Sequence, residues 1–245
     1  MKILVIGISL LLFNSCGKDN DDSKVITNPG SNSINKIMAL GASRVAGDRP
    51  EYESFRYELW KDLTENNWTF DYTGTQLDQA SYPLVNNLSF DTDHEGRGGW
   101  TSGEILNVIT NSLSQTGPPD IVLFSTPGGN DALQNLPYNQ MLLNIKAIVV
   151  ALQNANPEVT IIIEQGAPAR SDAMTPELTN YFNHLKQDVL TIATESSTTS
   201  SEIIAIDMFT GFTDALFADE VHYNEAGANF IASRYYTVLV NILEE

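Results

Sequence analysis

Short apolar runs alternate with longer helical segments along the chain, and this alternation is the feature that most restricts its fold. Five runs have the length and composition of β-strands: residues 37–40, 69–72, 121–124, 159–164 and 203–207. The last three are almost wholly apolar, as expected of strands that are buried on both faces of a parallel sheet. The pattern therefore predicts an α/β protein with a five-stranded parallel sheet.

The segments between these runs carry apolar residues at helical spacing. Phe55, Leu59 and Leu63 fall on one face of a helix, and the same spacing recurs within residues 142–152, 181–190 and 230–242. Helices that alternate with parallel strands cover both faces of the sheet, which gives a three-layer α/β/α sandwich. The chain of 245 residues is long enough for one such domain, which we place at residues 36–245.

The composition excludes one class of function. The formal net charge is −18, and the chain has only 13 lysines and arginines. Binding to a phosphate backbone needs a basic face. We therefore expect no nucleic-acid partner, and we interpret the charge as a solvated acidic surface.

The first residues have the pattern of an export signal. Lys2 precedes the apolar run 3–13, which is too short for a mature membrane span but suits a secretory signal peptide. The run leads into Ser15 and Cys16, the only cysteine, which therefore has no internal disulfide partner. A small residue before a lone cysteine resembles the bacterial lipobox, which implies that Cys16 is lipidated. The alternative is an ordinary signal peptide with an incidental cysteine.

Residues 16–35 are polar and rich in turn formers, and this composition is typical of a flexible tether. We thus divide the chain into a signal peptide at 1–15, a lipidated N-terminus and tether at 16–35, and the domain. The acidic run at 18–22 resembles a surface-export signal of Gram-negative lipoproteins. The expected location is the outer membrane, through a lipid anchor, on either its periplasmic or its cell-surface face.

Three polar stretches follow predicted strands. They are Gly41-Ala42-Ser43 after the first strand, Gly128-Gly129-Asn130-Asp131 after the third, and Asp219-Glu220-Val221-His222 after the fifth. Ligands of open α/β sheets bind beyond the carboxyl ends of the strands, so these stretches are expected to meet at one edge.

The residue types in these stretches suit ester hydrolysis. Ser43 is a candidate nucleophile, His222 a general base, and Asp219 the carboxylate that orients the imidazole. Asp207, at the end of the fifth strand, is the competing acid. The Asn130 amide and the Ser43 N–H are candidate donors to an oxyanion.

A third oxyanion donor is predicted in the segment 96–101, where a glycine N–H faces the same oxygen. The alternative is a simple flexible turn. His94, just before this segment, is expected to support the neighbouring loop. We find no spaced cluster of cysteine and histidine, and we expect no metal and no organic cofactor.

In this order, the stretches resemble the sequence blocks of the SGNH, or GDSL-type, hydrolase family. The matching positions are Gly41-Ala42-Ser43, Gly96, Gly128 to Asp131, and Asp219 to His222. The resemblance implies a flavodoxin-like sandwich, a triad of Ser43, His222 and Asp219, and an oxyanion hole formed by the Ser43 N–H, the Gly96 N–H and the Asn130 side chain. Ala42 departs from the family, which has aspartate there, and this bears on loop rigidity and rate more than on the reaction.

Within the family, the segment 93–101 and Tyr57-Glu58-Leu59 look most like the carbohydrate esterases that remove acetyl groups. A polar loop with Gln76, Asp78 and Gln79, and with Tyr82, Asn86 and Asn87 after them, suits a hydroxyl-rich ligand better than an acyl chain. We therefore expect a serine esterase that takes an acetylated carbohydrate or another small ester. The alternatives are a lysophospholipase or lipid esterase and a non-catalytic carbohydrate-binding domain.

Overall fold

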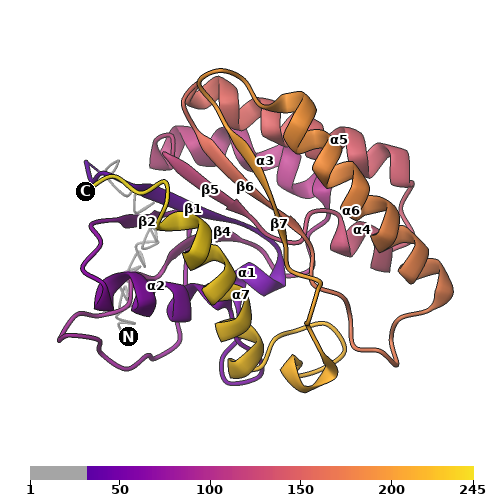
Figure 1. Cartoon of the computed structure of the whole chain (residues 1–245), viewed down its shortest axis with the longest axis horizontal. Helices are drawn as coiled ribbons and strands as arrows, with labels where there is room; N and C mark the ends of the chain where they lie inside the picture. The colour runs from indigo at the N-terminus through magenta and orange to yellow at the C-terminus, as the bar shows by residue number, and fades with distance from the viewer. Residues whose placement is uncertain (1–31) are drawn as a thin grey trace, which may run out of the picture.

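A mostly parallel β-sheet forms the middle layer of the computed structural model, which describes residues 32–245 (Figure 1). The strands are β1 (Lys36–Gly41), β2 (Asp71–Thr73), β3 (Gln76–Leu77), β4 (Asp93–Gly96), β5 (Ile121–Phe124), β6 (Thr160–Gln165) and β7 (Ile203–Asp207). Their order is β3-β4-β1-β5-β6-β7, and β2 also pairs with β1. β1 therefore lies inside the sheet, where both of its edges are paired.

The five predicted strands correspond to β1, β2, β5, β6 and β7, and all of these pair in parallel. The predicted strand count is wrong, because the sheet has seven strands and β3 is antiparallel to β4. β3 has two residues, and β4 has the sequence Asp-His-Glu-Gly. Neither has the apolar composition by which strands are predicted, since the side chains of β4 bind polar partners instead of forming an apolar core.

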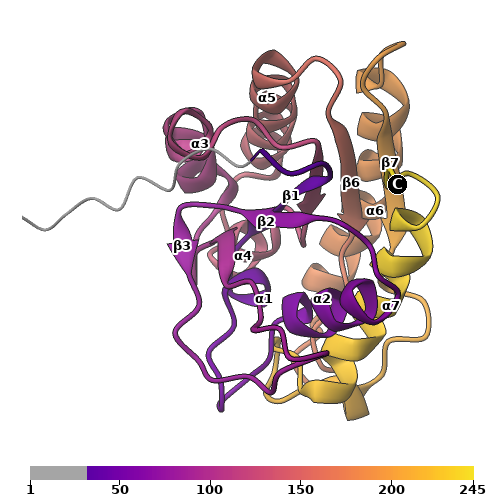
Figure 2. The same cartoon turned by 90° about the vertical axis from the view of Figure 1, so that its left-hand side faces the viewer.

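Helices cover both faces of the sheet, which confirms the predicted three-layer sandwich (Figure 2). On one face lie α2 (Phe55–Glu65) and α7 (Glu225–Leu239), and on the other lie α3 (Ser102–Thr116), α5 (Tyr138–Ala155) and α6 (Pro176–Ser196). Side chains alternate along each strand, so Ile37 and Ala39 face the first layer whereas Met38 and Leu40 face the second. Each fully buried aliphatic side chain contributes about 1.5–3 kcal/mol to folding.

The segments that follow the strands carry the polar stretches predicted from the sequence. The short helix α1 (Ser43–Ala46) follows β1, and α4 (Gly129–Leu133) follows β5. The 3₁₀ turn η1 (Asp214–Leu216) and the loop after it connect β7 to α7. Asn224 caps α7, as its Oδ1 accepts from the Gly227 N–H at 3.0 Å, and this cap fixes the end of the loop that contains His222.

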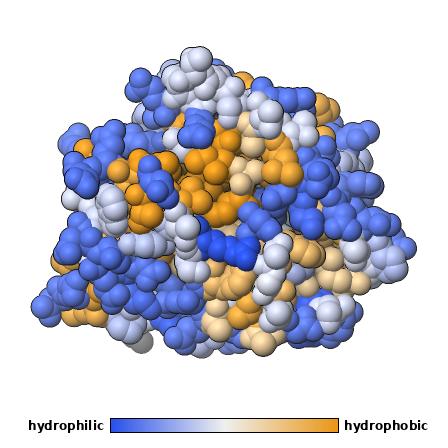
Figure 3. All heavy atoms as spheres, in the orientation of Figure 1, coloured by the Kyte–Doolittle hydropathy of each residue, from blue (hydrophilic) through white to orange (hydrophobic). Residues whose placement is uncertain are grey.

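The surface in the view of Figure 1 is largely hydrophilic, with an apolar patch near the centre of this face, over the region of the edge strand β7 (Figure 3). Among residues 32–245, no helix has the length and apolar character needed to cross a membrane. The predicted signal peptide, Cys16 and most of the tether lie outside the described residues, so these predictions remain untested.

Candidate active site

Ser43, His222 and Asp219 form a continuous chain of hydrogen bonds. Ser43 Oγ lies 2.9 Å from His222 Nε2, and His222 Nδ1 lies 2.7 Å from Asp219 Oδ2. This is the connectivity in which a carboxylate fixes the tautomer of an imidazole and the imidazole takes a proton from a hydroxyl. The structure thus brings together the three residues that the sequence predicted for the triad.

The loop that carries His222 holds Asp219 rigidly. The Val221 and His222 N–H groups both donate to Asp219 Oδ1 at 2.8 Å, which leaves Oδ2 for the imidazole. Partial burial raises the pKa of Asp219, but these hydrogen bonds from His222 and the two backbone N–H groups outweigh it and lower the pKa below its usual value. Asp219 therefore stays ionised, as an acceptor for the imidazole N–H must.

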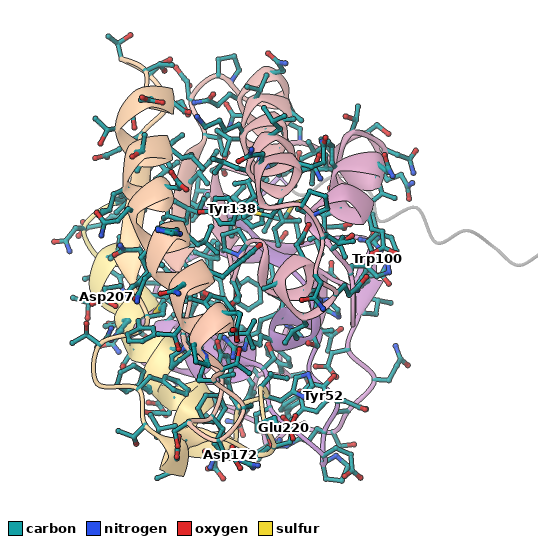
Figure 4. All side chains as sticks on the ribbon, turned by 90° about the vertical axis from the view of Figure 1, so that its right-hand side faces the viewer. Tyr52, Trp100, Tyr138, Asp172, Asp207 and Glu220 are labelled. Carbon is teal, nitrogen blue, oxygen red and sulfur yellow. The ribbon has the colours of Figure 1, made fainter. Side chains whose placement is uncertain are left out.

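Asp207 is not the carboxylate that binds the His222 imidazole. Its Oδ1 accepts from the Phe209 and Thr210 N–H groups at 2.8 and 2.9 Å. In Figure 4 it lies well away from Tyr52, the residue whose ring stacks on His222. The alternative that the sequence left open is therefore not supported by the geometry.

Arg44, the residue after the candidate nucleophile, ties the loops of the site together. The side chain is 8% exposed. Its Nε donates to the Val221 carbonyl at 2.8 Å, and its terminal nitrogens donate to the carbonyls of Ala167 at 2.8 Å and Pro168 at 2.7 Å. The turn that carries Ser43 is thus joined to the loop that carries His222 and to the segment after β6. Sequence analysis missed this role, because the acceptors are backbone carbonyls, which leave no motif.

Glu164, in β6, anchors the segment after β5. Its carboxylate is fully buried and accepts from the Thr126 N–H at 2.7 Å, from Thr126 Oγ1 at 3.0 Å and from the Tyr235 hydroxyl at 2.6 Å. Thr126 has a φ of 43°, which is unusual for a β-branched residue. The bonds to Glu164 therefore hold a strained backbone turn just before Gly128-Gly129-Asn130.

Two of the predicted oxyanion donors border one hollow. Ser43 and Asn130 both line a cavity of about 50 Å³. Asn130 Nδ2 donates one hydrogen to the Trp100 carbonyl at 2.8 Å, which leaves its second amide hydrogen available. Within residues 32–245, the Ser43 N–H makes no hydrogen bond, as is usual at the first position of a helix.

Gly96, the third predicted donor, does not line that hollow. Its N–H donates to His94 Nδ1 at 3.0 Å, so this donor is already occupied within its own segment. A Cβ at Gly96 would lie 2.6 Å from the Ala46 nitrogen, which means that only glycine fits between β4 and α1. The structure thus gives Gly96 a packing role, and the hydrogen bond confirms that His94 supports this segment.

Tyr52 is a further residue of the site that sequence analysis missed. Its ring stacks on the His222 imidazole, with centroids 3.8 Å apart and planes 13° from parallel. Backbone hydrogen bonds to Asp48 in both directions hold Tyr52 in place. A ring packed flat against the imidazole restricts its rotation, so Tyr52 positions His222.

The hollow beside Ser43, which we call the acyl hollow, is small and mainly apolar. Its apolar walls come from Ala42, Leu133, Ala169 and Phe182. Ala42, which departs from the sequence block that this segment resembles, provides no side-chain cap to α1. Arg44 supplies an anchor for this turn through the hydrogen bonds described above. In residues 32–245, no group of three or more histidine, cysteine, aspartate or glutamate side chains is arranged to hold a metal ion.

Comparison with known proteins identifies the family. The model of the GDSL-like Lipase/Acylhydrolase family matches residues 39–229. A carbohydrate esterase family 3 protein from Talaromyces cellulolyticus is similar in structure, with 26% identity, a TM-score of 0.71, and coverage of 85% of this chain and 98% of that chain. The family 3 carbohydrate esterase of Clostridium thermocellum gives 26% identity, a TM-score of 0.69, and 85% and 96% coverage.

A third similar structure is a mutant of an acetyl esterase with an acetate ion, at 25% identity, a TM-score of 0.71, and 85% and 98% coverage. Comparison with curated proteins gives no match. The chain belongs to the GDSL-like lipase/acylhydrolase family, and the protein is a carboxylic ester hydrolase. The predicted resemblance to SGNH hydrolases, and to carbohydrate esterases among them, is confirmed.

Replacing the two aspartates separately tests which one supports the base. We expect Asp219→Asn to lower kcat for p-nitrophenyl acetate by about three to four orders of magnitude, because the imidazole loses the acceptor that fixes its tautomer. Asp207→Asn, the matched control, should keep kcat within about twofold. Equal losses in the two variants would contradict the assignment.

Replacing Tyr52 tests the stacking on the base. Tyr52→Leu should lower kcat about two- to fivefold with little change in KM, since a cation–π contact of this kind contributes about 0.5–1 kcal/mol. Tyr52→Phe keeps the ring and should behave as wild type. If Phe and Leu have the same effect, the ring face does not act on His222.

Proposed function

We propose that the protein is a carbohydrate O-acetylesterase that acts through a triad of Ser43, His222 and Asp219. The observation that carries this proposal is the unbroken chain of hydrogen bonds from Ser43 Oγ through the imidazole to Asp219 Oδ2. In the first step, His222 takes the proton of Ser43 as its oxygen attacks the ester carbonyl. The Ser43 N–H and the Asn130 amide stabilise the oxyanion.

The rest of the reaction follows from the same groups. The protonated imidazole gives its proton to the leaving alcohol, and the acyl group stays on Ser43. Water then loses a proton to His222 and attacks the acyl-enzyme, which releases the carboxylic acid and restores the serine. Asp219, held by two N–H groups, stabilises the imidazolium in both steps.

The dimensions of the acyl hollow favour acetyl as the acyl group. A volume of about 50 Å³ holds a few water-sized groups, which suits a methyl group better than a long chain. The similar structures named as a carbohydrate esterase and an acetyl esterase support the same substrate class. A lipid esterase would need a longer apolar slot beside Ser43. A purely carbohydrate-binding domain would have no need of the aligned hydroxyl, imidazole and carboxylate.

Acyl-length profiling with Ser43→Ala as control tests this proposal. On p-nitrophenyl acetate, butyrate and octanoate, we expect kcat/KM to be highest for acetate and to fall by at least about tenfold for octanoate, because the longer chain does not fit the acyl hollow. Ser43→Ala should lower the activity by about three orders of magnitude or more. Preference for octanoate would favour a lipid esterase. No turnover of any ester would favour a binding domain.

We further propose that Cys16 carries a lipid that anchors the enzyme to a membrane. The support is the sequence pattern, with a signal-like run followed by Ser15 and the single cysteine. In a Gram-negative host, Cys16→Ala should abolish labelling of the protein by radioactive palmitate and release it from the membrane fraction. Unchanged labelling or unchanged fractionation in the variant would contradict the anchor.

A further inference from the structure

A second hollow, larger and more polar than the acyl hollow, lies at the C-terminal end of α1, and we call it the polar hollow. Its volume is about 650 Å³. The residues that matter to its chemistry are Asp48, Gln76, Asp78, His94, Arg97 and Trp100. None of these six lines the acyl hollow. They come from the segments after α1 and around β3 and β4, the strands that the sequence did not predict.

The polar hollow lies close to the candidate nucleophile. Its wall includes Ala46 and Gly47, and the Gly47 N–H donates to the Ser43 carbonyl at 2.8 Å. Four residues of helix place Gly47 roughly 6 Å along the axis from Ser43. On the other wall, the Trp100 carbonyl accepts from Asn130, the proposed oxyanion donor. A substrate with its ester at Ser43 and its acyl group in the acyl hollow would thus reach the polar hollow with its alcohol part.

His94 lines the polar hollow and carries a hydrogen-bond donor. The side chain is 5% exposed, and its Nδ1 accepts from the Gly96 N–H at 3.0 Å. Burial, together with the charges of Arg56 and Arg97, lowers the pKa of His94 to about 2, so the ring is neutral and its proton lies on Nε2. Nε2 makes no hydrogen bond to any residue that the structure describes. This N–H is therefore free to donate to a ligand.

Other groups around the hollow are held in fixed orientations. The Arg97 guanidinium pairs with Glu95, donates to Thr75 Oγ1 at 2.7 Å and lies 4.8 Å from the centroid of the Trp100 ring. Asp78 accepts from buried Arg56 at 2.7 Å and from the Ala80 N–H at 2.8 Å. Because these partners immobilise the side chains before a ligand binds, little conformational entropy is lost on binding.

The charges of the hollow select a neutral ligand. Asp48 and Asp78 balance Arg49 and Arg97, so there is no excess of one sign to attract a phosphate or a carboxylate. Planar amide, carboxylate and guanidinium groups beside an indole instead offer donors, acceptors and an apolar face. Those are the features that hydroxyl groups and C–H faces of a sugar ring require.

We propose that the polar hollow is the subsite for a neutral sugar ring of the substrate, the ring that bears or adjoins the acetyl ester at Ser43. This inference rests on the proposed function and adds where the carbohydrate binds. Of the polar loop singled out in the sequence, Gln76, Asp78 and Gln79 line the hollow. Asn86 and Asn87 form an exposed tight turn between Val85 and Leu88 instead, and take no part in it.

The test compares two substrates and two variants of the polar hollow. Trp100→Ala removes the indole but keeps the carbonyl that holds Asn130, and Gln76→Ala removes an amide whose hydrogen bonds within residues 32–245 are to Thr75. Steady-state kinetics are measured with p-nitrophenyl acetate and with acetylated xylotriose. We expect Trp100→Ala to lower kcat/KM for the trisaccharide about tenfold more than for p-nitrophenyl acetate, mainly through KM. Gln76→Ala should lower kcat/KM for the trisaccharide about threefold more than for p-nitrophenyl acetate. The matched control is Gln140→Ala, an exposed glutamine on α5, which should change neither value.

A binding measurement separates this inference from the proposed function. Calorimetric titration with unacetylated xylotriose does not depend on any chemistry at Ser43, so it reports on the hollow even if no ester turns over. The subsite is supported if xylotriose binds wild type and its Kd rises about tenfold in Trp100→Ala. If both substrates lose the same factor in Trp100→Ala and Gln76→Ala, or if the trisaccharide binds both variants as tightly as wild type, the subsite is overturned while the esterase stands. If wild type cleaves no ester but still binds xylotriose, only the proposed function is overturned.

Discussion

The buried guanidinium of Arg44 is the interaction on which the geometry of the site depends. It follows the candidate nucleophile directly and binds the carbonyls of Val221, Ala167 and Pro168. These carbonyls belong to segments that are far from Ser43 in sequence, and a backbone hydrogen bond from Arg170 to the Glu220 carbonyl at 2.8 Å joins two of these segments as well. A hydrogen bond to a charged group contributes about 1.5–3 kcal/mol, so these three bonds couple the segments strongly. The hydrogen bond of 2.9 Å between Ser43 and His222 depends on this coupling.

The sheet supplies the second constraint, since parallel strands end at one edge. β1, β5 and β7 each lead into one of the polar stretches, and the register of β1 against β5 and of β5 against β6 fixes where those stretches begin. The irregular segments there store some strain, as at Thr126, and the buried carboxylate of Glu164 offsets it. The result is a candidate nucleophile on a rigid corner, with a small apolar hollow at the N-terminal end of α1 and a large polar hollow at its C-terminal end. This asymmetry suits an ester with a short acyl group and a hydroxyl-rich alcohol.

Much of this arrangement could be predicted from the sequence. β5 and β6 are buried on both faces, whereas β7 is a partly exposed edge strand, so that part of the prediction was wrong for β7. The apolar runs of all three strands are nevertheless distinct from the helical spacing around them. The spacing of Asp219 and His222 and the segment Gly128 to Asp131 then located the site. The sequence could not reveal β4, whose Asp93, His94 and Glu95 read as a charged loop. Buried Glu95 is explained only by partners such as Arg97 and Ser112, which lie outside any apolar pattern.

The same limit applies to the residues that support the site. Tyr52 lies in a loop between α1 and α2, and nothing in its local sequence indicates that its ring covers His222. The donor predicted at Gly96 is occupied by His94, a contact that depends on the conformation of β4 and not on the motif. The most direct test of the central claim is to treat the protein with diisopropyl fluorophosphate and locate the adduct by peptide mass spectrometry. The account predicts one phosphorylated peptide, modified at Ser43, whose labelling is lost in His222→Ala. An unmodified protein, or an adduct on another residue, would contradict it.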